Sequence, residues 1–207
     1  GRTLDPVQVT FMRFVMQIIL LTPFILWGRL WAIPTGTFSM QFARGVLLAI
    51  ATVCFFAALQ HLPLAEAITI YFVQPLILTA ISALFLGEKL RLRRITAIAI
   101  GLVGVIIILQ PSLIIFGWPA LLPLITAIAM ACYVALTRRL AGQVHPYQMQ
   151  MMVGFSATAT LGFALLVGPI FEIPWTSFVW PTSQQLIWVA YMGLAATIGH
   201  IFIVWAA

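Results

Sequence analysis

The stretch LAEAITIYFVQPLILTAISALFLG, residues 64–87, is almost entirely apolar. A membrane-spanning helix needs about 20 mainly apolar residues, each rising about 1.5 Å, and this stretch is long enough. Its few polar residues are an acid near the start, Gln74 in the middle and single hydroxyls. The stretch therefore predicts a transmembrane helix, with lipid rather than water around it.

Six other stretches share this composition. We expect spans at residues 7–28, 43–62, 64–87, 95–110, 118–137, 146–171 and 184–207. The chain is 63% hydrophobic and 7% charged, whereas a soluble domain carries about 25% charged residues. Cys54 and Cys132 fall inside spans, where we expect buried free thiols. The predicted fold class is an all-α, polytopic transmembrane helical bundle.

Basic residues occur in every second loop between these spans. They are Arg29, Arg44, Lys89, Arg91, Arg93, Arg94, Arg138 and Arg139. Cytoplasmic loops carry an excess of Lys and Arg, so we expect the N-terminal end to face outside, in a multi-pass protein of the cell (inner) membrane. The net charge of +6 does not indicate nucleic-acid binding, because these residues lie in short turns rather than on one polar face.

A short motif occurs twice, as Asp5-Pro6-Val7-Gln8 and His145-Pro146-Tyr147-Gln148. An odd number of predicted spans separates the copies, so two related units would have opposite orientation, as in many secondary transporters. The repeats would be residues 1–111, lacking a first helix, and 112–207, lacking the last two. We thus expect seven spans of ten, in two inverted five-helix repeats, in a chain cut at both ends.

Further motifs follow one another in the first repeat. They are AALQHLPLAEA at 57–67, Gln74-Pro75, Leu86-Gly87-Glu88-Lys89-Leu90, Gly101-x-x-Gly104-Val105 and Gln110-Pro111. This order resembles the EamA-type transporters of the drug/metabolite transporter superfamily, with the glycine pair one residue closer than in the family. The resemblance implies a ten-helix carrier with a central cavity between its halves. It also implies small metabolites or drugs as substrates.

Arg13 is the charge placed deepest in a predicted span, about 10 Å from the Pro6 end by helical rise. An ionisable residue at such depth is costly and marks a functional site by default. We expect it to attract an anionic substrate group or to pair with an acid. The alternative is a side chain that extends to the lipid headgroups.

Several polar side chains inside spans are candidates for a cavity wall. Gln74 needs a partner for its amide, and Pro75 frees a backbone carbonyl near Tyr71. Helix–helix hydrogen bonding and a packing kink are the alternative roles. The other candidates are Thr126 and Tyr133 on one span, and Tyr191, Thr197 and His200 on another.

Glu66 and His200 are the candidates for coupling transport to protons, and Glu66 could instead hold a cationic substrate. Their structural alternatives are a helix-start carboxylate and a buried, hydrogen-bonded histidine. We assign Glu88 to ion pairing with the basic residues beside it, and Ala97, Gly101 and Gly104 to close helix packing. We expect no cofactor, no metal site and no catalytic residue, and we leave a homodimer open.

Two other functions compete with a carrier that works by alternating access. One is a membrane-embedded enzyme, since Gly154-Phe155-Ser156-Ala157 is similar to an intramembrane serine protease motif with His200 as base. Its final glycine, however, is Ala157. The other is a seven-helix receptor. A retinal-binding version is excluded because the only lysine, Lys89, lies in a loop.

Overall fold

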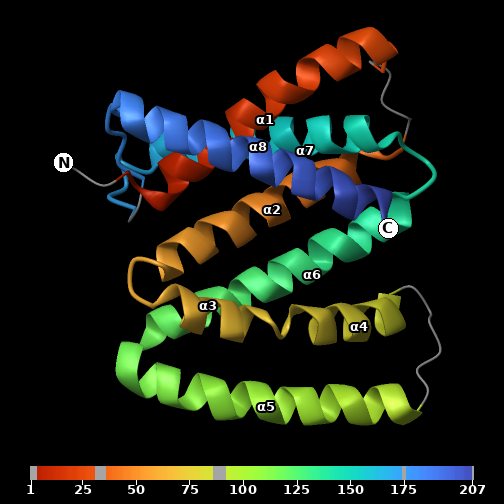
Figure 1. Cartoon of the computed structure of the whole chain (residues 1–207), viewed down its shortest axis with the longest axis vertical. Helices are drawn as coiled ribbons and strands as arrows, with labels where there is room; N and C mark the ends of the chain where they lie inside the picture. Colours follow the sequence, from red (N-terminus) through yellow and green to blue (C-terminus); the bar gives the residue numbers. More distant parts are fainter. Residues whose placement is uncertain (1–3, 31–35, 86–91, 174–175, 207) are drawn as a thin grey trace. The chain divides into compact units, whose positions relative to one another are not determined.

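The computed structural model describes residues 4–30, 36–85, 92–173 and 176–206, and the regular elements in these ranges are helices. In chain order they are α1 Pro6–Gly28, α2 Phe38–Ala58, α3 Leu64–Tyr71, α4 Gln74–Phe85, α5 Leu92–Phe116, the 3-10 turn η1 Trp118–Leu121, α6 Leu122–Leu140, α7 Pro146–Val167 and α8 Ser183–Trp205 (Figure 1). The all-α prediction is confirmed.

Seven segments of the described chain are long and apolar enough to cross a membrane. They correspond one by one to the seven predicted spans. Large apolar side chains remain exposed along them, among them Trp27 at 91% and Ile114 at 78%. Such exposure suits lipid as the surrounding solvent.

Two predicted details of the spans are wrong. The third span is interrupted at Phe72 and Val73, where the Val73 N–H bonds the Ile70 carbonyl at 3.2 Å and α3 gives way to α4. Proline has no N–H to continue the helical ladder, and Pro75 follows this break directly. The expected helix end at Pro111 does not occur, because α5 continues through it to Phe116, as transmembrane helices tolerate.

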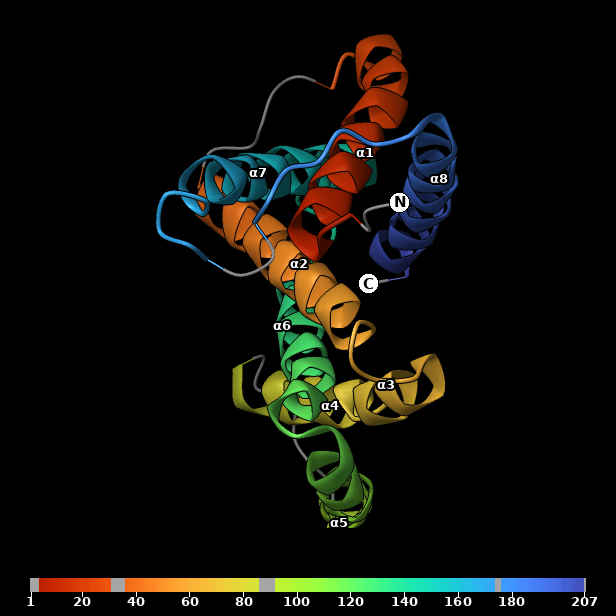
Figure 2. The same cartoon turned by 90° about the vertical axis from the view of Figure 1, so that its left-hand side faces the viewer.

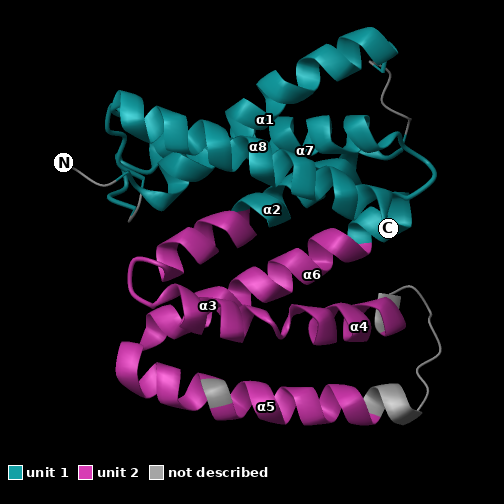
Figure 3. Ribbon diagram, viewed as in Figure 1, with its two compact units in different colours: residues 1–49, 136–207 teal, residues 50–135 magenta. Residues whose placement is uncertain are grey.

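The chain forms two compact units (Figure 3). Unit 1 comprises residues 1–49 and 136–207, and unit 2 comprises residues 50–135. Helices α2 and α6 each contribute one part to either unit. A packing unit groups helices by contact, whereas a repeat groups them by order in the chain. The predicted repeat boundary at residues 111 and 112 therefore stays a prediction.

In unit 1, α1 packs against both α7 and α8 (Figure 2). Small residues allow the helices to approach closely. A Cβ on Gly193 of α8 would lie 2.9 Å from Met16 Cγ on α1. On α2, a Cβ on Gly45 would lie 2.8 Å from the Cβ of Ser156 on α7. Unit 1 is thus held together by tight helix crossings.

In unit 2, α3 and α4 pack against α5. A Cβ on Gly101 would lie 2.2 Å from a Leu76 methyl carbon, so this glycine permits the α4–α5 contact as predicted. Gly104 faces open space instead. Leu62, Ile70 and Ala120 form a buried apolar cluster near the turn between α2 and α3.

Candidate functional site

A set of polar side chains lies buried where the helices of unit 1 meet. Arg13 and Gln17 stand one turn apart on the same face of α1, with 3% and 1% of their surface exposed. Gln150 of α7 is fully buried, and His200 of α8 is half-buried. We call these four residues the polar layer. The sequence predicted Arg13 and His200 but missed the two glutamines.

Hydrogen bonds connect the three helices through this layer. The Gln17 amide nitrogen donates to the Gln150 backbone carbonyl at 2.8 Å and to its side-chain oxygen at 3.4 Å. The Gln150 amide nitrogen donates to the His200 carbonyl at 3.0 Å. The Arg13 guanidinium carbon lies 4.3 Å from the centre of the Phe14 ring. The Gln17 and Gln150 side chains thus link α1, α7 and α8.

Arg44 is a second buried arginine of unit 1, which the sequence placed where the first loop meets the second span. Helix α2 begins at Phe38, earlier than expected, so Arg44 lies inside the helix with no exposed surface. Its Nε donates to the Thr137 hydroxyl at 3.0 Å, and a terminal nitrogen lies 3.5 Å from the Met149 carbonyl. Arg13 and Arg44 both interact electrostatically with His200. In the sequence, the signal for Arg44 was a second arginine next to a long apolar stretch.

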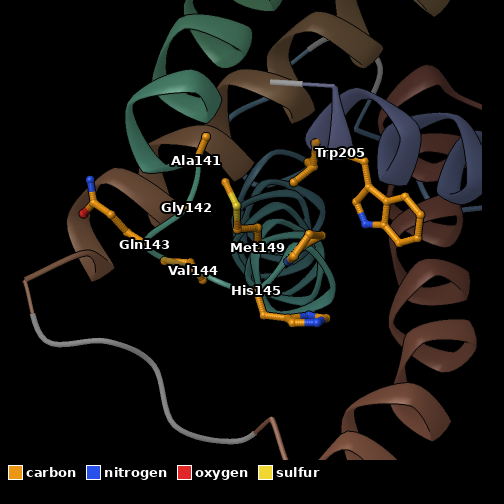
Figure 4. Close-up of a pocket in the computed structure, with 9 residues that line it drawn as sticks. Ala141, Gly142, Gln143, Val144, His145, Met149 and Trp205 are labelled. Atoms are coloured by element: carbon orange, nitrogen blue, oxygen red, sulfur yellow. The ribbon is translucent and has the colours of Figure 1, made fainter.

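Two pockets open at one end of unit 1, where α1 and α8 end and α7 begins. We call it the basic end, because Arg29, Arg138 and Arg139 are near. The larger pocket has a volume of about 560 Å³ and is lined by the turn from Ala141 to Pro146 together with Met149, Val204 and Trp205 (Figure 4). Ligand pockets commonly measure roughly 300–1,000 Å³. The smaller one, about 330 Å³, lies between the end of α1 and the start of α7.

The opposite end of unit 1 is closed by hydrogen bonds to the segment between α7 and α8. The Gln8 amide accepts from the Val179 N–H at 3.0 Å and donates to the Val179 carbonyl at 2.5 Å. Ser177 donates to the Asp5 carboxylate through its N–H at 3.1 Å and also through its hydroxyl. Side chains from the start of α1 thus attach this segment to the helix bundle.

The second copy of the short motif makes different bonds. The His145 N–H donates to Gln148 Oε1 at 3.2 Å, and His145 Nδ1 accepts from the Tyr147 N–H at 3.3 Å. This pattern caps the first turn of α7. Both copies start a helix with proline in the first turn, and both reach a distant segment, since the Gln148 amide nitrogen donates to the Leu30 carbonyl at 3.2 Å.

The remaining candidates of unit 1 differ in how deeply they are buried. Thr197 is buried on α8, one turn before His200, and its hydroxyl donates to the Gly193 carbonyl at 2.7 Å. Tyr191 lies on an exposed face of the same helix with 66% of its surface accessible. The structure therefore brings Thr197, but not Tyr191, close to the polar layer.

The candidates of unit 2 lie around the broken third span and α6. Tyr71 ends α3 with its ring 6.1 Å from that of Phe55, while Gln74, half-buried, and Pro75, exposed, begin α4. On α6, Tyr133 is fully buried and Thr126 donates to the Ala51 carbonyl of α2 at 3.1 Å.

The acidic candidates have local partners or lie outside the described residues. Glu66 is half-buried and accepts a hydrogen bond from the buried Ser112 hydroxyl of α5. This contact links α3 to α5, and both the coupling role and the helix-start role of Glu66 stay predictions. Glu88 lies outside the described residues, so its predicted ion pairing has no structural counterpart.

The hydroxyl of Ser156, the serine of the protease-like motif, forms its hydrogen bonds within its own helix. The Ser156 hydroxyl donates to the Met152 carbonyl at 2.9 Å and lies close to the Val153 carbonyl. It is also packed against Gly45, which leaves no room for a substrate carbonyl beside it. Within the described ranges, no group of three His, Cys, Asp or Glu side chains could hold a metal ion.

The fold and the site together define the class of protein: a multi-pass helical membrane protein with a buried polar layer and a pocket beside it. Residues 1–110 match the model of the EamA-like transporter family. The match covers more than half of the 207 residues. The chain belongs to the EamA-like transporter family, and it groups with transporters rather than with enzymes or receptors.

Individual relatives carry transporter names. A pseudopaline exporter of Pseudomonas aeruginosa is 28% identical over 79% of this chain and 55% of its own length. An uncharacterised transporter of Helicobacter pylori is 26% identical over 98% of the chain and 68% of its own length. A riboflavin transporter of Rhizobium johnstonii is 28% identical over 77% and 50%. The chain thus spans about half the length of the first of these relatives, and no solved structure matches it.

Proposed function

We propose that this protein is a secondary carrier that moves a small metabolite across the inner membrane by alternating access. The observation that carries the proposal is the polar layer of unit 1. It places a guanidinium and two amides inside helices that are long enough to span a bilayer. Polar side chains at such depth are costly and are found where a substrate or ion passes.

The two ends of unit 1 differ from each other, as is expected for one state of an alternating-access cycle. Pockets adjoin the basic end, which the charge pattern assigns to the cytoplasm, while Asp5 and Gln8 close the other end. A carrier open to one side only has this asymmetry. Family membership and the names of the relatives support transport of small molecules. Broken helices such as α3 and α4 occur at transporter sites, which keeps Tyr71, Gln74 and Pro75 among the proposed cavity residues.

Transport in vesicles tests the proposal. The full-length protein is reconstituted, and uptake and efflux are measured against a panel of metabolites. We expect at least one compound to be transported above protein-free vesicles, and we expect Arg13→Ala and Gln74→Ala to reduce that rate in folded protein. Unchanged transport in both variants would remove these residues from the site. Absence of transport across the panel would contradict the carrier function.

A further inference from the structure

Two helices of unit 1 begin with the same capping box, one built on a histidine and the other on a threonine. At the start of α7, the His145 N–H donates to Gln148 Oε1 at 3.2 Å, and His145 Nδ1 accepts from the Tyr147 N–H at 3.3 Å. At the start of α8, the Thr182 N–H donates to Gln185 Oε1 at 2.8 Å, and the Thr182 hydroxyl accepts from the Gln185 N–H at 3.3 Å. Both boxes satisfy backbone groups that the first turn of a helix leaves without a helical partner. The two helix starts therefore differ in the chemistry of the residue that caps them.

The histidine cap can change its charge, and the threonine cap cannot. A hydroxyl accepts a hydrogen bond at any physiological pH, whereas histidine changes charge between about pH 5 and pH 8. Neutral imidazole has one acceptor nitrogen, which in this cap is Nδ1, so the hydrogen lies on Nε2. Protonated imidazole has two N–H groups and no acceptor, and its charge would stand at the positive end of the helix dipole. Protonation of His145 therefore removes the side-chain cap of α7 and leaves that of α8 intact.

Within unit 1, no acidic side chain stands near a protonated His145. The two carboxylates in the residues of this unit are Asp5, which binds Ser177, and Glu172, which follows the far end of α7. The charged side chains that neighbouring elements bring to the basic end are Arg29 after α1, and Arg138 and Arg139 in the last turn of α6. The other titratable side chains near the pockets are Tyr147, which lines the smaller one, and His200, one turn before Val204 on α8. A charge on His145 would thus be added to an end that is already basic.

The position of His145 connects the cap to other parts of the unit. His145 lines both pockets of the basic end, and Figure 4 shows it among the side chains around the larger one. Its ring stacks on Tyr147 with the centroids 5.3 Å apart, and Tyr147 stacks on Phe24 of α1 at 5.4 Å. Gln148, which completes the capping box, also donates to the Leu30 carbonyl beyond the end of α1 at 3.2 Å. The first turn of α7 therefore forms part of both pocket walls and joins α7 to α1.

We propose that His145 is a pH-sensitive switch: acidification on the basic side protonates it, removes the cap and loosens the first turn of α7 beside both pockets. The stack on Tyr147 can persist, because a cation is attracted to an aromatic face, so the ring stays close while its hydrogen bond is lost. The start of α7 is most stable where the imidazole is neutral, and it loses this stability as the pH falls. One consequence rests on the proposed carrier function: access from the cytoplasmic side then depends on cytoplasmic pH.

Hydrogen exchange of the purified full-length protein at about pH 8 and about pH 5 compares the two caps within one molecule. Each rate is divided by that of an unstructured peptide at the same pH, which removes the intrinsic pH dependence of exchange. We expect protection of the Tyr147 and Met149 amides, which bond His145, to fall roughly twofold to thirtyfold at the lower pH, as for loss of a helix cap. The Gln185 and Leu186 amides, which bond the threonine cap of α8, should keep their protection.

Reciprocal substitutions provide matched controls. His145→Thr gives α7 the cap of α8, and its first turn should become insensitive to pH. Thr182→His gives α8 the cap of α7, and its first turn should lose protection at acidic pH. His145→Asn offers an uncharged amide oxygen and replaces the threonine variant if that variant does not fold.

Three results would overturn the inference. One is a pH response of the α7 start that persists in His145→Thr or in His145→Asn. Another is an equal response of both helix starts in the unsubstituted protein. The third is a hydrogen on His145 Nδ1 at neutral pH, which nitrogen NMR of the labelled imidazole detects directly.

Counterflow in vesicles distinguishes this inference from the proposed function. The probe is the compound of the metabolite panel with the highest rate, and only the pH on the basic side is varied. We expect the rate to depend more strongly on this pH in the unsubstituted protein than in His145→Thr. A pH-dependent cap in a protein that transports no compound would support the switch and contradict the carrier. Transport with the same pH dependence in both proteins would support the carrier and overturn the control of access by His145.

Discussion

The two units bury different kinds of polar group. The buried polar side chains described in unit 2 are the small hydroxyls of Ser82, Ser112 and Thr126. Unit 1 buries hydroxyls as well, but it also buries four glutamines and two arginines. These are Gln8, Gln17, Gln41, Gln150, Arg13 and Arg44. A hydroxyl can bond the carbonyl of its own helix, as Thr126 does with Leu122, whereas a buried amide or guanidinium needs partners from several helices. The buried hydroxyls of unit 2 can therefore be satisfied within one helix, whereas the buried amides and guanidinium groups of unit 1 need several helices.

Replacing Gly45 with alanine should have the largest effect on stability. The new Cβ would lie 1.6 Å from Ser156 Oγ and 2.9 Å from the Val153 carbonyl oxygen, so α2 and α7 must move apart. Overpacking of this kind costs about 1–3 kcal/mol. Gly104→Ala in unit 2 is the matched control, because its Cβ meets nothing within 4 Å and alanine favours helix. Thermal unfolding in detergent should separate the two, and equal melting temperatures would contradict the tight α2–α7 crossing.

Gln150→Leu should destabilise unit 1 by less than this, about 1–2 kcal/mol, because it removes bonds to both α1 and α8. Thr126→Val is the counterpart in unit 2. It loses one interhelical bond to Ala51, for which about 0.6 kcal/mol is typical in membrane helices. Chemical denaturation of both variants measures the difference. If Thr126→Val proved the more damaging, the polar layer would not be the main polar link between helices.

Each unit contains one serine that donates to a carboxylate, and the two serines should respond differently to alanine. Ser112 is fully buried beneath Glu66, so Ser112→Ala should cost about 1 kcal/mol. In Ser177→Ala the half-buried Asp5 keeps its bond from the Ser177 N–H at 3.1 Å, and we expect about half that cost or less. The melting temperatures of the two variants measure the two losses of stability. A larger loss in Ser177→Ala than in Ser112→Ala would contradict this prediction.

The smallest effect on global stability should come from the two glutamines of the repeated motif. Gln8→Ala should speed hydrogen exchange of the Val179 amide, because Gln8 holds both backbone groups of that residue. Gln148→Ala should leave the Val179 amide unchanged and affect the first turn of α7 and the end of α1, because Gln148 bonds its own cap and the Leu30 carbonyl. Exchange followed by mass spectrometry compares the segment 176–180 in both. Slow exchange there in Gln8→Ala would show that other contacts hold this segment.

Apolar run length was enough to predict the seven spans, because a bilayer of given thickness sets the number of residues a helix needs. Basic loops were enough to predict an orientation, and motif order was enough to indicate the family. The helix breaks were predicted less well, because the local effect of a proline competes with the packing of its helix. Pro75 lies in the first turn of a new helix that begins after a break, while Pro111 lies in an unbroken helix, and both have the same backbone chemistry.

The site itself depended on contacts between segments far apart in the chain. Arg13 was conspicuous in the sequence, since a charge within an apolar run is rare. Gln17 and Gln150 drew no attention, and Arg44 served only to predict the orientation, because nothing local shows that residues more than a hundred positions apart become neighbours. Tyr191 illustrates the reverse, as a promising residue that lies on an exposed face. Hydrophobicity is a property of each segment alone and can be read along the chain. Which polar faces turn toward one another is decided only when the helices pack.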